Sequence, residues 1–293
     1  MLKKKYKVYL YLLPALIVLL VFVFYPIINT VIFSFDETKA SGFKFGIGSY
    51  KYLFNDKRFR QSLINTLIYA AVVPFLSVSI SLLLANTLVH LKNKKLQSMF
   101  QSIYFLPYVT SLVAIGIVWS WLFNSEYGVI NYLLRIIGFK GINWLNDPKY
   151  GMVALIIFAV WKSLAFNTLI LTTGIASINP QYYQAAKIDQ ASSRTIFTQI
   201  TIKLVSPMIA YTYMISLIAA FKVYTEVYVL FGGRTLDGAV STVVRYIIDR
   251  FYGEKRSISL NDIKQYGFLV EQGFIPRLKY LDVVDKVYFN ENI

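Results

Sequence analysis

The sequence predicts an all-α polytopic membrane protein, and its composition and its charge pattern both support this prediction. Of its 293 residues 56% are hydrophobic and only 15% are charged, whereas about a quarter of the residues of a soluble domain are charged. Five stretches with few or no charges are each long enough to cross the hydrocarbon core of a bilayer, which is about 30 Å thick. These features exclude a disordered chain and an ordinary cytosolic enzyme, and the absence of cysteine excludes a disulfide-stapled secreted module.

The first predicted span covers residues 8–35, which contain no charged side chain. Its apolar run is too long for the h-region of a signal peptide, and no small-residue cleavage site follows it. We therefore interpret it as a transmembrane helix with a cytoplasmic N-terminus, because basic residues favour the cytoplasmic side of a span. Those that precede it are Lys3, Lys4, Lys5 and Lys7.

Four further spans are predicted along the chain. Residues 62–89 are uncharged and end at a basic cluster that fits a cytoplasmic turn. Residues 96–125 carry Trp119 and Trp121 near their far end, where interfacial aromatic residues belong. The fourth span, residues 151–178, contains one charged residue, Lys162. The fifth span, residues 204–231, contains two, Lys222 and Glu226.

The C-terminal segment differs from the rest of the chain. Residues 257–293 include nine charged side chains among 37 and no uncharged run that approaches the length of a span. We therefore expect a membrane domain over residues 1–256 and a charged, non-spanning tail over residues 257–293, whose origin the sequence leaves open.

The charge pattern indicates a membrane partner rather than a nucleic acid. The formal net charge is +15, and we assign the excess lysines and arginines to the flanks of spans in a lipid bilayer. There is no G-x-x-x-x-G-K-[ST] motif for ATP, and with one histidine and no cysteine no metal cluster is expected. The adjacent Asp36 and Glu37 are interpreted as a solvated pair, and Gly46-Ile47-Gly48 as a loop. The sequence thus predicts neither an enzyme nor a cofactor in this chain.

Polar residues inside the predicted spans are the candidates for a transport pathway. A charge at the centre of a bilayer costs about 2.5–3.5 kcal/mol, so Lys162 must face a cavity or a counter-charge. It lines a pathway, forms an ion pair with Glu226 or a partner subunit, or extends to the membrane interface by snorkelling. Glu226 can instead pair with Lys222, four residues away on one helix. Aromatic faces suit sugar rings, although the chain has 23 tyrosines. The candidate pathway residues are Lys162, Asn167, Tyr213, Tyr224 and Glu226.

The loop between the fourth and fifth spans, residues 179–203, has local signals for two short helices. Asn179 can cap a helix whose first residue is Pro180 and which runs to about Lys187. Asp189 can cap a second helix toward Phe197. Small residues in between permit the close approach of another surface, although an ordinary interfacial loop would look the same.

This loop and the spans around it resemble the membrane subunit of binding-protein-dependent bacterial ABC importers for oligosaccharides and glycerol phosphate. The family loop reads E-A-A-x-x-D-G-A, followed by a Phe, an Ile, a Leu-Pro and a further Pro. The resemblance covers about residues 5–256. Matches in the same order and spacing outside the loop are Leu106-Pro107, residues 119–123 and 127–131, Trp144-Leu145, Trp161-Lys162, residues 221–230 and Gly232-Gly233. Matches within and after the loop are Ala185, Ala186, Asp189, Ala191, Phe197, Ile200 and Pro207.

The resemblance implies one half of an importer pore in the bacterial cytoplasmic (inner) membrane. It implies a second, homologous permease subunit, cytoplasmic ATP-binding subunits that hold ATP and Mg, and an extracellular sugar-binding protein. The chain itself would perform no bond chemistry. The residues expected to dock the ATPase are Gln184, Ala185, Ala186, Asp189 and Ala191.

The chain departs from the family pattern in the loop and after the fifth span. The motif glutamate is Gln184, its glycine is Gln190 and its Leu-Pro is Ile202-Lys203. The family has a sixth span, but here the resemblance ends near Arg256, which leaves truncation, frameshift or a genuine five-span variant open. The alternatives are an importer of glycerol phosphate or another solute and a truncated membrane interaction or regulatory protein that does not transport.

Overall fold

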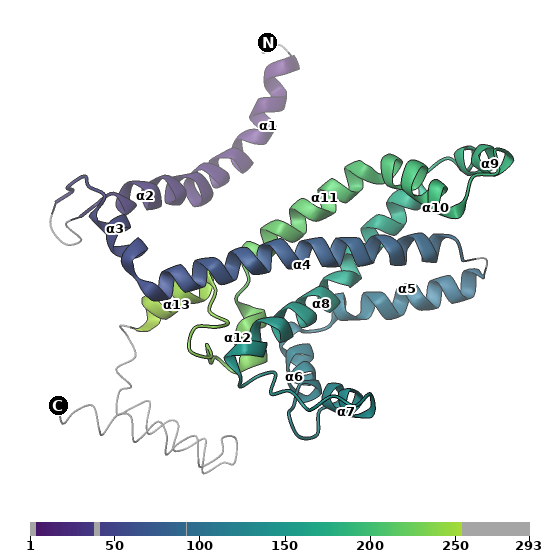
Figure 1. Cartoon of the computed structure of the whole chain (residues 1–293). Helices are drawn as coiled ribbons and strands as arrows, with labels where there is room; N and C mark the ends of the chain where they lie inside the picture. The colour runs from purple at the N-terminus through teal and green to yellow at the C-terminus, as the bar shows by residue number, and fades with distance from the viewer. Residues whose placement is uncertain (1–3, 38–41, 92, 254–293) are drawn as a thin grey trace, which may run out of the picture. The chain divides into compact units, whose positions relative to one another are not determined.

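The computed structural model describes residues 4–37, 42–91 and 93–253 (Figure 1). These residues form α-helices and two π-helical segments, with no named β-strand among them, which confirms the predicted all-α class. The chain divides into two compact units, residues 1–61 and 62–293. The charged tail expected over residues 257–293 lies outside the described residues.

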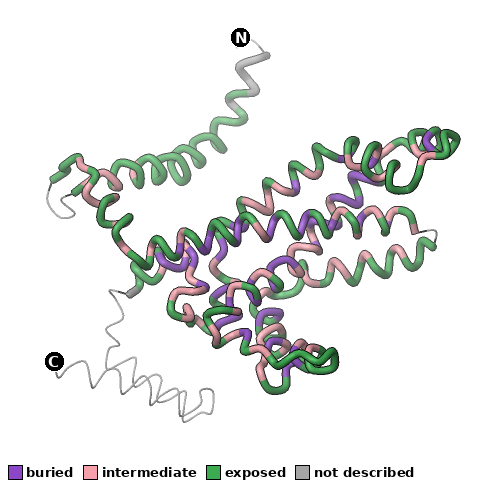
Figure 2. Tube along the Cα trace, in the orientation of Figure 1, coloured by how far each residue is buried: buried purple, intermediate pink, exposed green. Residues whose placement is uncertain are grey.

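In the first unit, α1 (Lys4–Leu19), η1 (Leu20–Phe24) and α2 (Tyr25–Ser34) follow one another without a break. The π-helical segment ends two residues before Pro26, whose missing N–H and ring disfavour regular α-helical bonding in the preceding turn. Residues Tyr11–Ser34 are long and apolar enough to cross a membrane, and none of them is buried (Figure 2). This matches the first predicted span.

The turn that follows is held by the two acidic residues after this helix. Asp36 Oδ1 accepts a hydrogen bond from the backbone N–H of Lys44 at 3.1 Å, and Glu37 Oε1 accepts one from Gly48 at 2.8 Å. The helix α3 (Gly48–Asn55) starts at the second glycine of Gly46-Ile47-Gly48. These carboxylates therefore order a turn, a role that their interpretation as a solvated pair did not include.

The second unit is built on long apolar helices. They are α4 (Lys57–Val89), which begins in the first unit, α5 (Lys94–Val109), α8 (Pro148–Ala176) and α11 (Ile202–Phe221). The short α10 (Ser193–Thr195) and the π-helical η2 (Ile196–Thr201) lead into α11 without a break, so that Ser193–Phe221 forms one apolar stretch. Including Tyr11–Ser34, four helical segments of the described residues are long and apolar enough to span a membrane.

The third predicted span, residues 96–125, is divided between two helices. The segment forms α5 and α6 (Leu112–Leu122), bent by 103° at the break between them. Thr110 takes an extended backbone conformation at this break, one turn after Pro107, which has no N–H for the helical ladder. The expected five spans are therefore reached among the described residues only if this bent pair counts as one.

The fifth predicted span, residues 204–231, also breaks. The helix α11 ends at Phe221, and a short helix, α12 (Thr225–Phe231), starts after Lys222, Val223 and Tyr224. The break is stabilised from outside, because Thr242 Oγ1 donates a 2.9 Å hydrogen bond to the carbonyl of Val223. The helix α12 then ends at Gly232, whose φ of 59° is a conformation that glycine adopts without strain.

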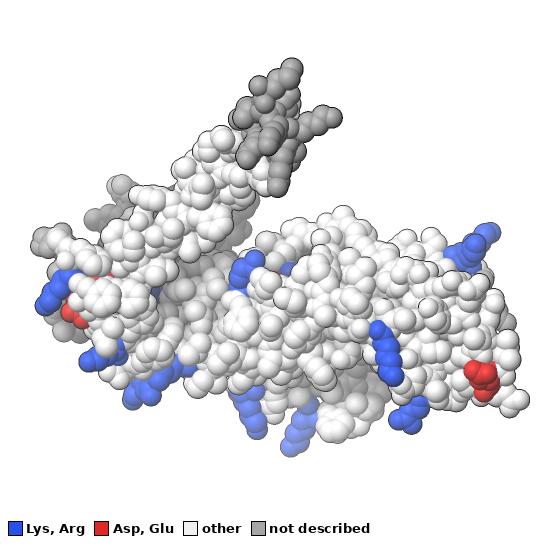
Figure 3. Space-filling model, turned by 90° about the horizontal axis from the view of Figure 1, so that it is seen from above, with Lys and Arg blue, Asp and Glu red and all other residues white. Residues whose placement is uncertain are grey.

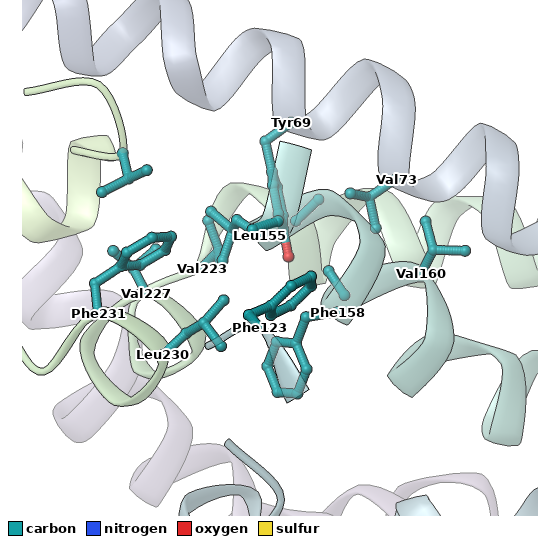
Figure 4. Packing of buried hydrophobic residues seen from close by; sticks show 14 of the residues in the cluster. Tyr69, Val73, Phe123, Leu155, Phe158, Val160, Val223, Val227, Leu230 and Phe231 are labelled. Carbon is teal, nitrogen blue, oxygen red and sulfur yellow. The ribbon is translucent and has the colours of Figure 1, made fainter. Parts of the chain in front are cut away.

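The main core of the second unit joins α4, α6, α8 and α12. Its fully buried large side chains include Phe123, Phe158 and Phe231, around which Tyr69 and Val227 pack (Figure 4). A second buried cluster joins α4, α8 and α11 through Val78, Leu171, Ile175 and Val205, with Ala85. The short α12 is therefore a packed part of the core, and its neighbours fix its position.

Two segments outside the long helices are fixed by buried hydrogen bonds. In α7 (Val129–Ile136), the fully buried Asn131 donates to the carbonyl of Ile142 at 2.8 Å and accepts from Trp144 Nε1 at 3.0 Å. Before α13 (Val243–Gly253), Asn65 of α4 donates to the carbonyls of Gly238 and Ser241. The connections α6–α8 and α12–α13 are thus parts of the folded unit.

Charged groups are sparse over much of the surface. On the face drawn in Figure 3, the basic side chains lie scattered and most of the area is neither basic nor acidic. Many exposed side chains of the long helices are large and apolar, for example Phe75 of α4 at 62% and Met214 of α11 at 62% exposure. Such a surface is stable against hydrocarbon rather than water.

The close approach of α6 and α12 gives a test of the fold. A Cβ atom added at Gly116 would overlap the side chain of Val229, so Gly116→Ala should destabilise the chain by about 1–3 kcal/mol through overpacking. The thermal unfolding midpoint of the purified protein in detergent, followed by tryptophan fluorescence, should fall. Adding Val229→Ala to this variant should restore most of the lost thermal stability. A Gly116→Ala variant as stable as the parent would contradict this packing.

Candidate functional site

The second unit contains a cavity of about 280 Å³ between α4, α5, α8, α11 and α12. Its lining combines small apolar residues of α8 and α11 with aromatic rings and a few polar groups. Such a mixture is typical of sites that bind small molecules. The polar and aromatic residues are Lys162, Ser163, Asn167, Ser216, Glu226, Tyr69, Tyr108 and Phe166.

An ion pair lies in the wall of this cavity. Lys162 Nζ donates to Glu226 Oε1 at 2.7 Å, with 32% and 18% of the two side chains exposed. Both residues also line the cavity. The structure thus confirms the Lys162–Glu226 pairing, which was one of the interpretations left open, and it also places the pair at a cavity. The alternative pairing of Glu226 with Lys222 is wrong, because the helix breaks between these two residues.

Asn167 connects three helices beside the ion pair. Its Nδ2 donates to Ser77 Oγ of α4 at 3.2 Å, and its Oδ1 accepts from Ser216 Oγ of α11 at 3.2 Å. The side chain is almost fully buried, at 1% exposure. A buried amide with both ends bonded holds its neighbours in register, so Asn167 fixes α4 and α11 around the part of α8 that faces the cavity.

The aromatic part of the cavity wall was not predicted from the sequence. Tyr108 and Phe166 stack with ring centroids 5.5 Å apart and an interplanar angle of 22°, and Tyr69 faces the same cavity from α4. Phe166 could have been found, since it lies one helical turn from Lys162. Tyr69 and Tyr108 come from other predicted spans, where nothing in the local sequence marks them.

The two candidate tyrosines do not line the cavity. Tyr213 packs against the second buried cluster. Tyr224 caps the start of α12 and lies with Tyr228 under the guanidinium of Arg245, 6.0 and 5.6 Å from the two ring centroids. Sugar contact by Tyr213 and Tyr224 therefore stays a prediction, and it gains no support from the lining of this cavity.

The loop predicted to dock a partner folds much as its sequence indicates. The helix α9 (Pro180–Ile188) starts at Pro180, and Asn179 Oδ1 accepts from the N–H of Gln181 at 3.0 Å. Asp189, however, does not cap a second helix. Ser192 does, with its Oγ accepting from the N–H of Thr195 at 3.1 Å. Asp189 instead ends α9 as its C-cap residue.

The candidate docking residues differ in exposure. Gln184, Ala185 and Asp189 are exposed, Ala191 is half-buried and Ala186 is buried. Gln190, which replaces the glycine of the family motif, has a φ of 55°, a conformation that costs about 1 kcal/mol for a residue with a side chain. The chain therefore keeps the turn that the motif glycine would make, at the expense of local strain.

The described residues contain no group of three or more His, Asp or Glu side chains that is able to hold a metal ion. The candidate site lies in two separate places in the fold. One is the cavity with its ion pair, and the other is the exposed face of α9.

Comparison with known proteins identifies the type of protein that these features resemble. A family model described as "Binding-protein-dependent transport system inner membrane component" matches residues 77–252. The arabinooligosaccharides transport system permease protein AraP of Bacillus subtilis is 32% identical over 246 residues, which cover 83% of this chain and 78% of AraP. The lactose transport system permease protein LacF of Rhizobium radiobacter is 35% identical over 234 residues, covering 78% and 77% of the two chains.

A solved structure has the same fold. It is that of a bacterial ABC transporter involved in the import of the acidic polysaccharide alginate, and it superposes with a TM-score of 0.74. The match covers 98% of this chain and 95% of that chain at 23% sequence identity. At this identity the likeness concerns the fold.

The ion pair gives a test that does not depend on function. Removing one partner leaves an uncompensated charge in the membrane, so Lys162→Met and Glu226→Gln should each lower the free energy of unfolding by about 2 kcal/mol. The double variant Lys162→Met/Glu226→Leu should regain most of this loss, because no charge remains. Thermal unfolding in detergent compares the stability of the three variants with that of the parent. Single variants as stable as the parent would refute the pairing.

Proposed function

The chain belongs to the family of binding-protein-dependent transport system inner membrane components, and on this basis we propose that it forms half of the translocation pathway of an ABC importer for an uncharged sugar or oligosaccharide. The proteins AraP and LacF, which serve arabinooligosaccharides and lactose, support the sugar class. The observation that carries the proposal is the cavity whose wall contains the Lys162–Glu226 ion pair.

The chemistry of the cavity suits a sugar ring. The stacked pair of Tyr108 and Phe166 offers an apolar aromatic wall for the C–H faces of a pyranose. Ser163 and Ser216 offer hydroxyl groups, and the ion pair offers a donor and an acceptor. A few fixed polar groups in an apolar cavity orient a ligand that is held by its apolar faces.

The same cavity argues against glycerol phosphate, the other solute class considered. Among the described residues that line it, Lys162 is the only cation, and its charge is already compensated by Glu226 at 2.7 Å. A phosphate with up to two negative charges requires free cations or backbone donors. An uncharged sugar has no such requirement.

The second part of the proposal concerns α9, which docks a cytoplasmic ATP-binding subunit. Its exposed face includes Gln184, Ala185 and Asp189, with Ile188 at 81% exposure. Small side chains let a groove of the partner approach the helix closely, and the apolar Ile188 gains free energy when it is covered. ATP and Mg are bound by that partner, and the N-terminus of this chain is cytoplasmic.

The complete importer contains further subunits. A second, homologous permease supplies the other half of the pathway, and a binding protein outside the membrane delivers the sugar. The description of the family as part of a binding-protein-dependent transport system supports the binding protein. An importer permease and a regulatory membrane protein that does not transport would both dock the ATP-binding subunit. Only the permease would support sugar uptake, so uptake distinguishes the two hypotheses.

Removal of the aromatic wall tests the pathway. In proteoliposomes with the ATP-binding subunits, the second permease and the binding protein, Phe166→Ala should lower the uptake of neutral oligosaccharide about tenfold, since aromatic contacts contribute about 0.5–1.5 kcal/mol each. Phe75→Ala on the exposed face of α4 is the matched control and should leave uptake unchanged. The proposal fails if the unmodified chain, fully assembled, imports no sugar or prefers glycerol phosphate.

Substitutions on α9 test the docking. Within the described residues the Asp189 side chain makes no hydrogen bond or ion pair, so Asp189→Ala should leave the fold intact. It should still reduce recovery of the ATP-binding subunit with the tagged chain, and Ala185→Trp should abolish it by blocking close approach. Gln199→Ala, an exposed change outside α9, is the control. Full recovery with Ala185→Trp would contradict docking at this face.

A further inference from the structure

The helix α9 lies at one end of the bundle, beyond the ends of α8 and α11 (Figure 1). Of its nine residues only Ala186 is buried, at 7% exposure. Between α9, the end of α4 and η2 lies a hollow of about 400 Å³, lined by Asn86, Lys187 and Phe197 among others. The helix is therefore supported by a few side chains around a hollow and lacks a continuous packed interface.

Tyr183 is the side chain that crosses this gap. Its hydroxyl lies 3.2 Å from Thr201 Oγ1, in the fully buried last residue of η2. Its ring meets the ring of His90 edge to face, with centroids 5.7 Å apart. In the described part of the chain, no other α9 side chain has a hydrogen bond that reaches another helix.

Both partners of Tyr183 are firmly attached to membrane-spanning helices. Thr201 directly precedes Ile202, the first residue of α11. His90 directly follows α4, and its Nδ1 donates a 2.7 Å hydrogen bond to the carbonyl of Asn86, one turn back. One tyrosine thus contacts both the end of α4 and the π-helical segment that leads into α11 without a break.

We infer that Tyr183 is the positioning residue through which a displacement of α9 reaches α4 and α11 during transport. The inference rests on the proposed docking of an ATP-binding subunit at α9. A hydrogen bond resists separation and a ring contact resists compression, so Tyr183 passes on motion in both directions. The backbone connection through Gln190 and Ala191 is a turn, and a turn can absorb a displacement by changes in its φ and ψ angles.

The experiment measures coupling separately from docking. In the reconstituted importer, Tyr183→Phe removes the hydroxyl and keeps the ring, and Thr201→Val removes the other hydroxyl with little change of shape. Each should lower the sugar imported per ATP hydrolysed about fivefold, the factor expected for the loss of one hydrogen bond of ordinary strength. Recovery of the ATP-binding subunit should not change.

The double variant and a matched control separate coupling from general damage. Tyr183→Phe/Thr201→Val should be no worse than either single variant, because both remove the same bond. Tyr211→Phe on the exposed face of α11 makes the same chemical change elsewhere. It should leave the amount of sugar imported per ATP hydrolysed unchanged. An unchanged ratio in Tyr183→Phe, or additive losses in the double variant, would overturn the inference.

The result also distinguishes this inference from the function on which it rests. If the unmodified chain recovers no ATP-binding subunit, the proposed function fails and the inference with it. If the unmodified importer works and Tyr183→Phe works equally well, only the inference fails.

A distance measurement provides a second, independent readout. Because the chain has no cysteine, Thr87→Cys in α4 and Gln181→Cys in α9 would carry the only spin labels in this chain. Their separation should stay constant between the nucleotide-free and ATP-bound importer, and it should change in a Tyr183→Ala background. A separation that changes as much with Tyr183 present would show that α9 moves independently of α4.

Discussion

A lysine within a membrane-spanning helix must find a counter-charge or water, and the arrangement of the second unit follows from how Lys162 does so. Its partner Glu226 is 64 residues away on α12, at a distance of 2.7 Å. Glu226 reaches this position because α11 ends at Phe221 and the chain restarts as a separate short helix. The break that interrupts the fifth predicted span is thus the feature that closes the ion pair and completes the cavity wall.

The position of α12 is in turn determined from both sides. On one side, Gly116 lets α6 approach so closely that a methyl group there would overlap Val229. On the other, Thr242 bonds the carbonyl of Val223, and Arg245 lies over two tyrosine rings of the α12 region while donating to the carbonyl of Gly233 at 2.8 Å. The cavity therefore depends on residues well beyond those that line it, including the start of α13.

The sequence predicted those features that depend on local signals. The cap at Asn179 and the helix from Pro180 were correct because capping chemistry acts within a few residues. The breaks after Val109 and Phe221 were missed, because hydropathy measures the length of an apolar run and says nothing of its direction. Tyr69 and Tyr108 were missed for a related reason, since only the packing of separate helices brings them to one cavity.

The position of α9 in the chain connects the two parts of the site. It follows α8, which carries Lys162 and Asn167, and it precedes η2 and α11, which carries Ser216. Asn167 joins these two helices through Ser216. Under the proposed docking and the inferred role of Tyr183, a displacement of α9 acts on both helices that line the cavity, and a change in their separation acts directly on the Asn167–Ser216 bond. Coupling therefore requires no long-range pathway, only that α9 remain rigidly connected to the spans on either side.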